Sequence, residues 1–325
     1  MRQLIHSFLI IFLSLLCGYV IQLLIKKEYF VLPFSLEKIR KFLQKLGLLF
    51  LMPIIIFGVY WVMDFQELKF FLFPFLGIFN LIFSGMIALF IAKLLSMNPK
   101  DAGSFFCCGF FSNFSNIGGL ICFLFFGEEG YKLVLLYTLF VRILNFTLGF
   151  PVAKYYAIKA NKEDNSHFNF NLVMKDPFVV AALVSIIAGL SLNASGIERP
   201  TIYSSIIAIF IPANTIVLLV SIGISTHLNK IKIYLREALL INGLKFIIMP
   251  IVMVSLGFLL GYHRINQALP LKIILILSSS PAAFVALIPP SQYGLNLDLA
   301  NSCWIFNTLS MAFVIPILFF LLRII

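Results

Sequence analysis

Long stretches without charged side chains constrain the fold of this sequence more than any other feature. A helix that crosses about 30 Å of hydrocarbon needs roughly 20 apolar residues, and ten stretches of about that length follow one another in the chain. They cover residues 3–25, 46–63, 70–92, 104–127, 131–155, 177–197, 200–226, 237–261, 270–292 and 299–322. The sequence therefore predicts an all-α polytopic membrane protein with ten transmembrane helices.

The composition excludes several other classes of protein. Of the 325 residues, 61% are hydrophobic and 11% are charged, whereas soluble domains are about 25% charged. An ordinary soluble enzyme, a disordered chain, a disulfide scaffold and a nucleic-acid-binding domain are all excluded on this ground. The loops between the ten stretches are too short for a soluble domain, so we expect one membrane domain.

The distribution of Lys and Arg predicts the orientation in the membrane. Of the 24 basic residues, 15 fall in the loops after the first, third, fifth, seventh and ninth stretches, and seven fall on the opposite side. Because cytoplasmic loops carry the excess of Lys and Arg, these odd loops face the cytosol. We therefore expect a multi-pass protein of the cell (inner) membrane with both termini on the extracytoplasmic side, its first span retained rather than cleaved.

Two interpretations suit the segment before the second span. Leu36, Ile39, Phe42, Leu43 and Leu46 are apolar at helical spacing, with basic residues between them. This pattern is typical of a surface helix on anionic lipid. It is equally consistent with a cytosolic extension of the second span.

Ten spans divide into two halves of five, which would have opposite orientations. This is the inverted-repeat plan of many transporters. It divides the chain into a first repeat at 1–155, a short cytosolic linker at 156–175 and a second, inverted repeat at 176–325. Pro53 and Pro212 each lie in the second span of a half. A proline within a span bends the helix, so both are candidate helix breaks or hinges.

The fourth span of each half carries polar residues and helix breakers within apolar sequence. Such groups are costly in a membrane unless they line a cavity or face protein, and interrupted helices in corresponding positions indicate a transport site. A broken helix also exposes unpaired N–H groups that attract a carboxylate. The candidate substrate-binding residues here are Asn113, Ser115, Asn116, Gly118, Gly119, Ser279, Ser280 and Pro281. The alternatives are small-residue helix packing in the fourth span and a simple proline kink in the ninth.

Arg142, near the middle of the fifth span, completes the candidate site as a counter-charge for an anion. A structural ion bound to helix carbonyls, or a snorkelling side chain, is the alternative. We expect Lys245, nearer the cytosolic third of the eighth span, to snorkel. No Asp or Glu lies near the centre of a span, which favours an anion and disfavours a carboxylate-based proton pump.

Enzyme chemistry has no visible support in the sequence. Intramembrane metal chemistry needs clusters of His, Cys, Asp or Glu, and no such spacing occurs within a span; the paired Cys107 and Cys108 are no exception. We therefore expect no enzymatic activity, no cofactor and no metal.

Several motifs together resemble a known family. They are Met52-Pro53, Gly109 to Asn113, Asn116 to Gly119, Phe126-Gly127, Asp176-Pro177, Pro212 through Gly223, Pro281 to Ala283, Tyr293-Gly294, Leu299 to Ser302, Thr308 to Ser310 and Ile315-Pro316. This pattern resembles the auxin efflux carrier family, and the short central loop is similar to its bacterial, malonate-permease-like members. The resemblance implies ten spans in a 5+5 inverted repeat, with broken helices 4 and 9 crossing at the substrate site near Asn113, Asn116 and Pro281. It also implies secondary transport of organic anions such as indole acetate or malonate.

The leading hypothesis is thus a secondary transporter of a small carboxylate that works by elevator-like alternating access. It would be a uniporter driven by membrane potential, with H⁺ or Na⁺ coupling left open. The alternatives are a sodium-coupled carrier like the bile acid symporters and an anion sensor that does not transport. Expected partners are the organic anion and membrane lipids, with a homodimer as one candidate assembly and no nucleic acid.

Overall fold

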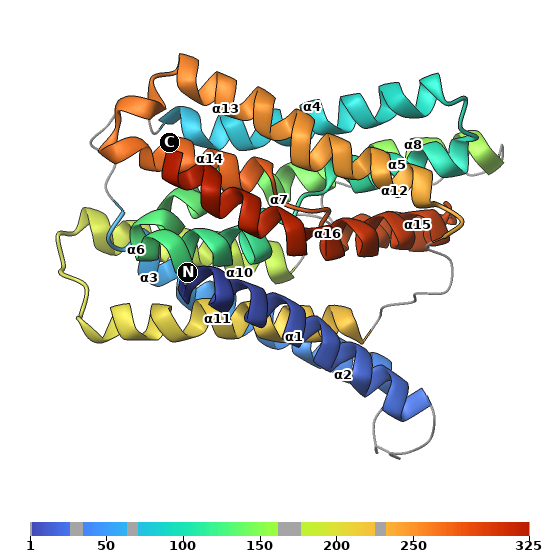
Figure 1. Cartoon of the computed structure of the whole chain (residues 1–325). Coiled ribbons are helices and arrows are strands. Elements are labelled where there is room, and N and C mark those ends of the chain that lie inside the picture. The colour runs from blue at the N-terminus through green and yellow to red at the C-terminus, as the bar shows by residue number, and fades with distance from the viewer. Residues whose placement is uncertain (1, 27–34, 64–70, 162–176, 225–231, 325) are drawn as a thin grey trace. The chain divides into compact units, whose positions relative to one another are not determined.

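The computed structural model describes residues 2–26, 35–63, 71–161, 177–224 and 232–324 (Figure 1), and within them it contains helices and no β-strand. Six of these helices are long and apolar enough to cross a membrane: Lys38–Tyr60, Phe73–Leu94, Phe114–Ala160, Ile202–Gly223, Leu235–Leu259 and Leu297–Ile324. Three shorter apolar helices cover Leu9–Ile25, Val180–Ala194 and Asn266–Ser278. An all-helical, multi-pass membrane protein is therefore confirmed, whereas the number of ten spans stays a prediction.

The helices form two compact units, and each unit takes segments from both halves of the chain. The first unit comprises Met1–Leu68, Gly119–Leu135 and Met174–Thr226. The second comprises Lys69–Gly118, Leu136–Val173 and His227–Ile325. The units in space therefore differ from the two sequence halves, since every unit is assembled from segments distant in the chain.

In the first unit, helices from one half of the chain pack against helices from the other half. Its elements are α1 (Arg2–Lys26), α2 (Leu36–Lys45), the π-helical turn η1 (Leu46–Leu51), α3 (Met52–Tyr60), most of α6 (Gly119–Tyr137), α10 (Pro177–Ala194) and α11 (Ile202–Gly223). Helix α1 packs along α11, and α10 packs along α3. The first helix of each predicted half thus lies against the second helix of the other predicted half.

Glycines allow the α1–α11 pair to approach closely. A Cβ on Gly18 would lie 2.2 Å from the carbonyl oxygen of Val220, and one on Gly223 would lie 2.3 Å from that of Leu15. Small residues at a crossing bring helix backbones together in membranes. The two glycines therefore set the distance between these helices.

The amphipathic segment before the second span is a helical extension of that span. Helix α2 starts at the N-cap Ser35, whose hydroxyl accepts from the backbone N–H of Lys38, and it continues without a break through η1 into α3. Of the two interpretations, the structure supports the continuous one.

The second unit contains the segments that carry the polar interruptions. Its elements are α4 (Phe73–Leu94), α5 (Pro99–Phe110), η3 (Phe114–Gly118), α7 (Val141–Leu144), η4 (Asn145–Gly149), α8 (Phe150–Asn161), α12 (Leu235–Gly243), η5 (Leu244–Ile248), α13 (Met249–Leu259), η6 (Tyr262–Arg264), η7 (Asn266–Ala268), α14 (Leu269–Ser278), η8 (Phe284–Leu287), α15 (Ile288–Tyr293) and α16 (Leu297–Ile324). Helix α4 packs on α5, α13 packs on α14, and α16 packs on both α5 and α12. Of the expected linker at 156–175, residues 156–161 belong to α8 and the remainder lies outside the described residues.

Three prolines inside long helices each follow a π-helical turn. Pro53, Pro151 and Pro250 come two residues after the ends of η1, η4 and η5. In each case the residue before the proline donates its N–H to the carbonyl five residues earlier. Proline has no N–H and its ring collides with the carbonyl four residues before it, so a wider turn at this place lets the helix continue.

The two prolines that the sequence marks as helix breaks lie in continuous helices. Pro53 follows η1 inside the helix Lys38–Tyr60, and Pro212 lies inside α11. Neither proline interrupts its helix, and a hinge at either position stays a prediction.

Candidate functional site

The fourth predicted span is interrupted at its centre, as the sequence indicates. Helix α5 starts at the N-cap Asn98, whose side-chain oxygen accepts from the N–H of Asp101 at 3.0 Å. It ends at Phe110, and Phe111 is already extended, with φ −74° and ψ 117°. Ser and Asn compete with the helix for backbone hydrogen bonds, which accounts for the interruption at residues 112 and 113.

Asn113 begins the next turn of helix. Its backbone carbonyl accepts from the N–H of Gly118 at 3.1 Å. Its side-chain oxygen accepts from the N–H of Ile117 at 3.5 Å, a long hydrogen bond. The chain then winds through η3 and enters α6, which bends again at Gly127, where φ is +62°.

The ninth predicted span is interrupted by its serines and proline. The hydroxyls of Ser278 and Ser280 donate back to the carbonyls of Leu275 and Ile276, at 3.1 and 3.3 Å. Pro281 cannot continue the helix and also disfavours helical geometry at the residue before it. Helix α14 therefore ends at Ser278, and helical turns resume at Phe284.

The two interrupted segments cross and pair with each other. Ser112 and Ala282 form an isolated antiparallel β-bridge. The N–H of Asn113 donates to the carbonyl of Pro281 at 2.8 Å, and the N–H of Ala283 donates to that of Phe111 at 2.9 Å. Unpaired backbone groups are costly in apolar surroundings, so each break satisfies the backbone of the other.

Helix α16 supplies the remaining partner for the crossing. The side-chain oxygen of Asn307, a fully buried residue, accepts from the N–H of Ala282. The amide of Asn307 donates to Asn242 on α12 at 2.8 Å, and Asn242 donates to Ser310 on α16. Hydrogen-bonded side chains of α16 and α12 thus hold the crossing in place.

Glycine brings η3 directly against the end of α14. A Cβ on Gly118 would lie 2.5 Å from the hydroxyl oxygen of Ser280. The structure therefore brings together Asn113, Gly118, Ser280 and Pro281 from the predicted site.

The other predicted site residues lie around the crossing or away from it. Ser279 is buried at the end of α14, Ser115 and Asn116 are half-buried on η3, and Gly119 is the first residue of α6. Arg142 is half-buried on α7, which packs against α4 and is not one of the segments that form the bridge.

The structure places a different cation at the crossing. Lys245, on η5, is 1% exposed, and its Nζ donates to the hydroxyl oxygen of Ser112 at 2.6 Å. The prediction that Lys245 snorkels is wrong, because its side chain reaches a polar partner inside the protein instead. No local sequence signal places Lys245 at the crossing, because its partner Ser112 lies 133 residues away in the chain.

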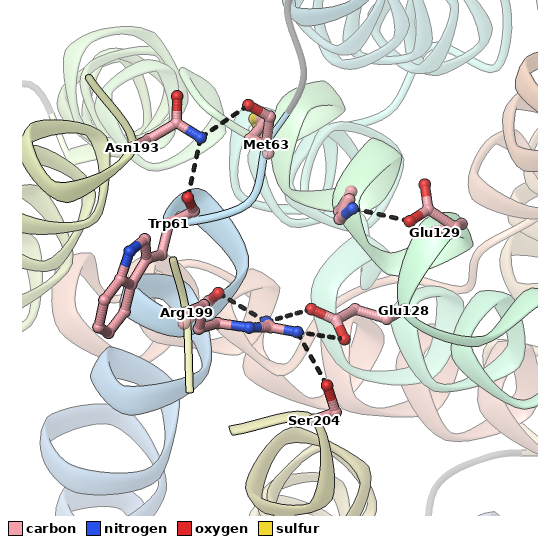
Figure 2. Close-up of polar contacts among 9 residues, drawn as sticks. Trp61, Met63, Glu128, Glu129, Asn193, Arg199 and Ser204 are labelled. Atoms are coloured by element: carbon pink, nitrogen blue, oxygen red, sulfur yellow. Dashed lines mark hydrogen bonds and ion pairs between the residues drawn. The ribbon is translucent and has the colours of Figure 1, made fainter. Parts of the chain in front are cut away.

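A second polar cluster, in the first unit, surrounds Arg199 (Figure 2). This guanidinium forms two hydrogen bonds with the carboxylate of Glu128 and donates to the carbonyl of Gly58 at 2.8 Å and the hydroxyl of Ser204 at 3.0 Å. The cluster ties the end of α3 to α6 and to the start of α11.

Asn193 and Trp61 close the same end of α3 (Figure 2). The amide of Asn193 donates to the carbonyls of Trp61 and Met63, at 2.8 and 3.1 Å. The indole N–H of Trp61 donates to the carbonyl of Ile197 at 2.7 Å. These contacts satisfy carbonyls that the helix end leaves free, so the cluster is explained by its role in holding the end of α3 in place.

The fold and the crossing define a class: a polytopic α-helical membrane protein in which two interrupted helices pair within apolar sequence. No protein-family model matches the chain. The chain is similar to a protein described as an uncharacterized transporter from Methanothermobacter thermautotrophicus, with 22% identity over 146 residues. That alignment covers 45% of this chain and 46% of the relative, so less than half the length of either protein is matched.

Proposed function

We propose that this protein is a secondary transporter of a small organic anion, of the auxin- or malonate-like carboxylate class. The observation that carries the proposal is the crossing of the two interrupted segments at Ser112 and Ala282. It gathers hydroxyl and amide side chains in apolar sequence, where polar groups are costly unless they serve a site. Similarity to an uncharacterized transporter is consistent with it.

The charge of the buried residues supports an anion as the substrate. Among the described residues that are buried, Lys245 is the one charged side chain, and it lies at the crossing. A positive charge in apolar surroundings favours a bound anion and opposes a cation.

The helix pairing supports a 5+5 inverted repeat as the proposed architecture, and with it membership of the auxin efflux carrier family. The α1–α11 and α10–α3 pairs are related as an inverted repeat requires, and so are the α4–α5 and α13–α14 pairs. In the proposed mechanism the second unit carries the anion at the crossing and moves as a body, which exposes the site alternately to each side of the membrane.

Flux into proteoliposomes tests this function. Purified protein would be offered labelled malonate and indole acetate, with and without an imposed potential, a sodium gradient or a proton gradient. We expect saturable uptake that follows the potential without either ion gradient. Uptake that requires sodium would favour a carrier like the bile acid symporters, and binding without flux would favour an anion sensor.

Two substitutions connect flux to the predicted site. Asn113→Ala removes the side chain that caps η3 beside the bridge, so we expect slower uptake by protein that still folds. Arg142→Ala tests the counter-charge role assigned from sequence. Wild-type uptake by either variant would remove that residue from the site.

A further inference from the structure

The ammonium group of Lys245 is buried without a described carboxylate to neutralise it. The described ion pairs, Arg199 with Glu128 and Lys132 with Glu129, involve other cations. A buried charge without a counter-ion is strongly unfavourable. An anion that binds nearby would therefore favour the charged form of the lysine, and the charged lysine would in turn favour the bound anion.

Ser112 links this charge to the crossing. Its hydroxyl oxygen accepts a hydrogen bond from Nζ of Lys245 at 2.6 Å. A hydroxyl that accepts a hydrogen bond keeps its own O–H to donate, and donation from a cation strengthens the bond that it can make next.

If Ser112 is to pass the influence of the lysine charge to an anion, the serine must be more exposed than the lysine, and it is. Lys245 is 1% exposed, whereas Ser112 is half-buried. Ser112 also belongs to the β-bridge itself, beside Asn113. Of the two residues, Ser112 is therefore the one with exposed surface that an anion at the crossing would meet.

We propose that the Ser112 hydroxyl, polarised by the buried ammonium group of Lys245, is the hydrogen-bond donor that binds the carboxylate of the transported anion. The proposal rests on the proposed function and specifies its site. The charge that holds the anion is then part of the protein, so binding needs no sodium ion.

Equilibrium binding to the purified protein tests this assignment separately from transport. The probes are malonate and indole acetate, and the uncharged comparisons are malonamide and indole acetamide. The variants are Lys245→Met and Ser112→Ala. Their matched controls are Lys93→Met, which removes an exposed lysine from α4, and Ser104→Ala, which removes a buried hydroxyl from α5.

We expect each site variant to weaken binding of at least one of the two acids by about tenfold or more, since hydrogen bonds that involve a charged group are the strong ones. Binding of the corresponding amide should change little, and the control variants should bind as wild type does. Wild-type binding should be the same in sodium and in choline buffers.

Three results would overturn the assignment: unchanged binding of both acids by the site variants, equal loss of acid and amide, or a sodium requirement in the wild type. Charge-dependent binding without flux would leave the assignment standing and contradict transport. Flux that is unaffected by both site variants would leave transport standing and contradict the assignment of Ser112 and Lys245. Wild-type protein that binds neither acid would contradict both.

Discussion

At the scale of single residues, a substitution of Lys245 distinguishes a role in anion binding from a role in stability. An ammonium group in apolar surroundings costs free energy even when one hydroxyl accepts from it. Methionine has a similar length and no charge. We therefore expect Lys245→Met to leave the free energy of unfolding unchanged, or to raise it by about 1–3 kcal/mol.

Thermal unfolding in detergent, followed by intrinsic fluorescence, measures this effect. The same experiment on Ser112→Ala should show the opposite sign, because that change leaves the ammonium group without its partner. A Lys245→Met variant whose unfolding temperature lies well below that of the wild type would show that the lysine is needed to hold the crossing together.

Two neighbouring glutamates offer a comparison of a partly buried and an exposed ion pair (Figure 2). The side chain of Arg199 is 8% exposed and that of its partner Glu128 is 21% exposed. Glu129, which pairs with Lys132 at 2.7 Å, is 67% exposed. The same substitution at the two positions therefore compares two ion pairs that differ mainly in how far they are exposed to solvent.

We expect Glu128→Gln to lower the free energy of unfolding by about 1–3 kcal/mol, because it weakens hydrogen bonds to a partly buried guanidinium. Glu129→Gln should lie within about 0.5 kcal/mol of the wild type, since exposed ion pairs contribute little. Equal losses in denaturant-induced unfolding of the two variants would show that the Arg199 cluster does not support the end of α3.

The sequence could mark some residues of the site and not others. Asn113, Gly118, Ser280 and Pro281 are visible because polar residues and helix breakers are conspicuous in apolar sequence. Lys245 lies on η5, far from Ser112 in the chain, and only the fold brings the two together. Charge and position along a span alone favour Arg142, which lies on α7, a helix that does not form the bridge.

At the scale of helices, close packing at glycines should determine stability. A methyl group on Gly18 would meet the backbone of α11 at 2.2 Å, and backbone cannot move aside as a flexible side chain does. We expect Gly18→Ala to lower the free energy of unfolding by about 1–3 kcal/mol, as overpacking does.

Gly243, at the end of α12, is the matched control, because a Cβ there has nothing within 4 Å. Gly243→Ala should be neutral or stabilising by up to about 1 kcal/mol, since alanine is the better helix former. If both variants unfold at the same denaturant concentration, the α1–α11 distance does not depend on Gly18.

Helix positions follow from the apolar pattern, whereas the consequences of proline do not. The predicted spans 3–25, 70–92 and 299–322 agree closely with α1, α4 and α16. Pro53, by contrast, predicts a break, and the helix continues because η1 widens before it. Whether a proline breaks a helix or follows a π-helical turn depends on hydrogen bonds that packing with neighbouring helices selects.

At the scale of the whole molecule, the number of spans decides whether the two halves are inverted. Among the described residues from 177 to 201, none belongs to the six long apolar helices, so on that count both ends of α10 share one side of the membrane. The ten-span prediction makes α10 a span. Its 18 residues give a length of about 27 Å, close to the hydrocarbon thickness of about 30 Å.

Cysteines placed at the two ends of this region distinguish the two topologies. We expect a cysteine in place of Asn161 to react with a membrane-impermeant maleimide from the cytosol only, and one in place of Ser195, an exposed residue after α10, to react from outside only. The background should carry Cys17→Ala, because the cysteines at 107, 108, 122 and 303 are buried and Cys17 is exposed. Labelling of both positions from the same side would show that α10 does not cross. The second half would then have lost the inversion on which alternating access at a shared crossing depends.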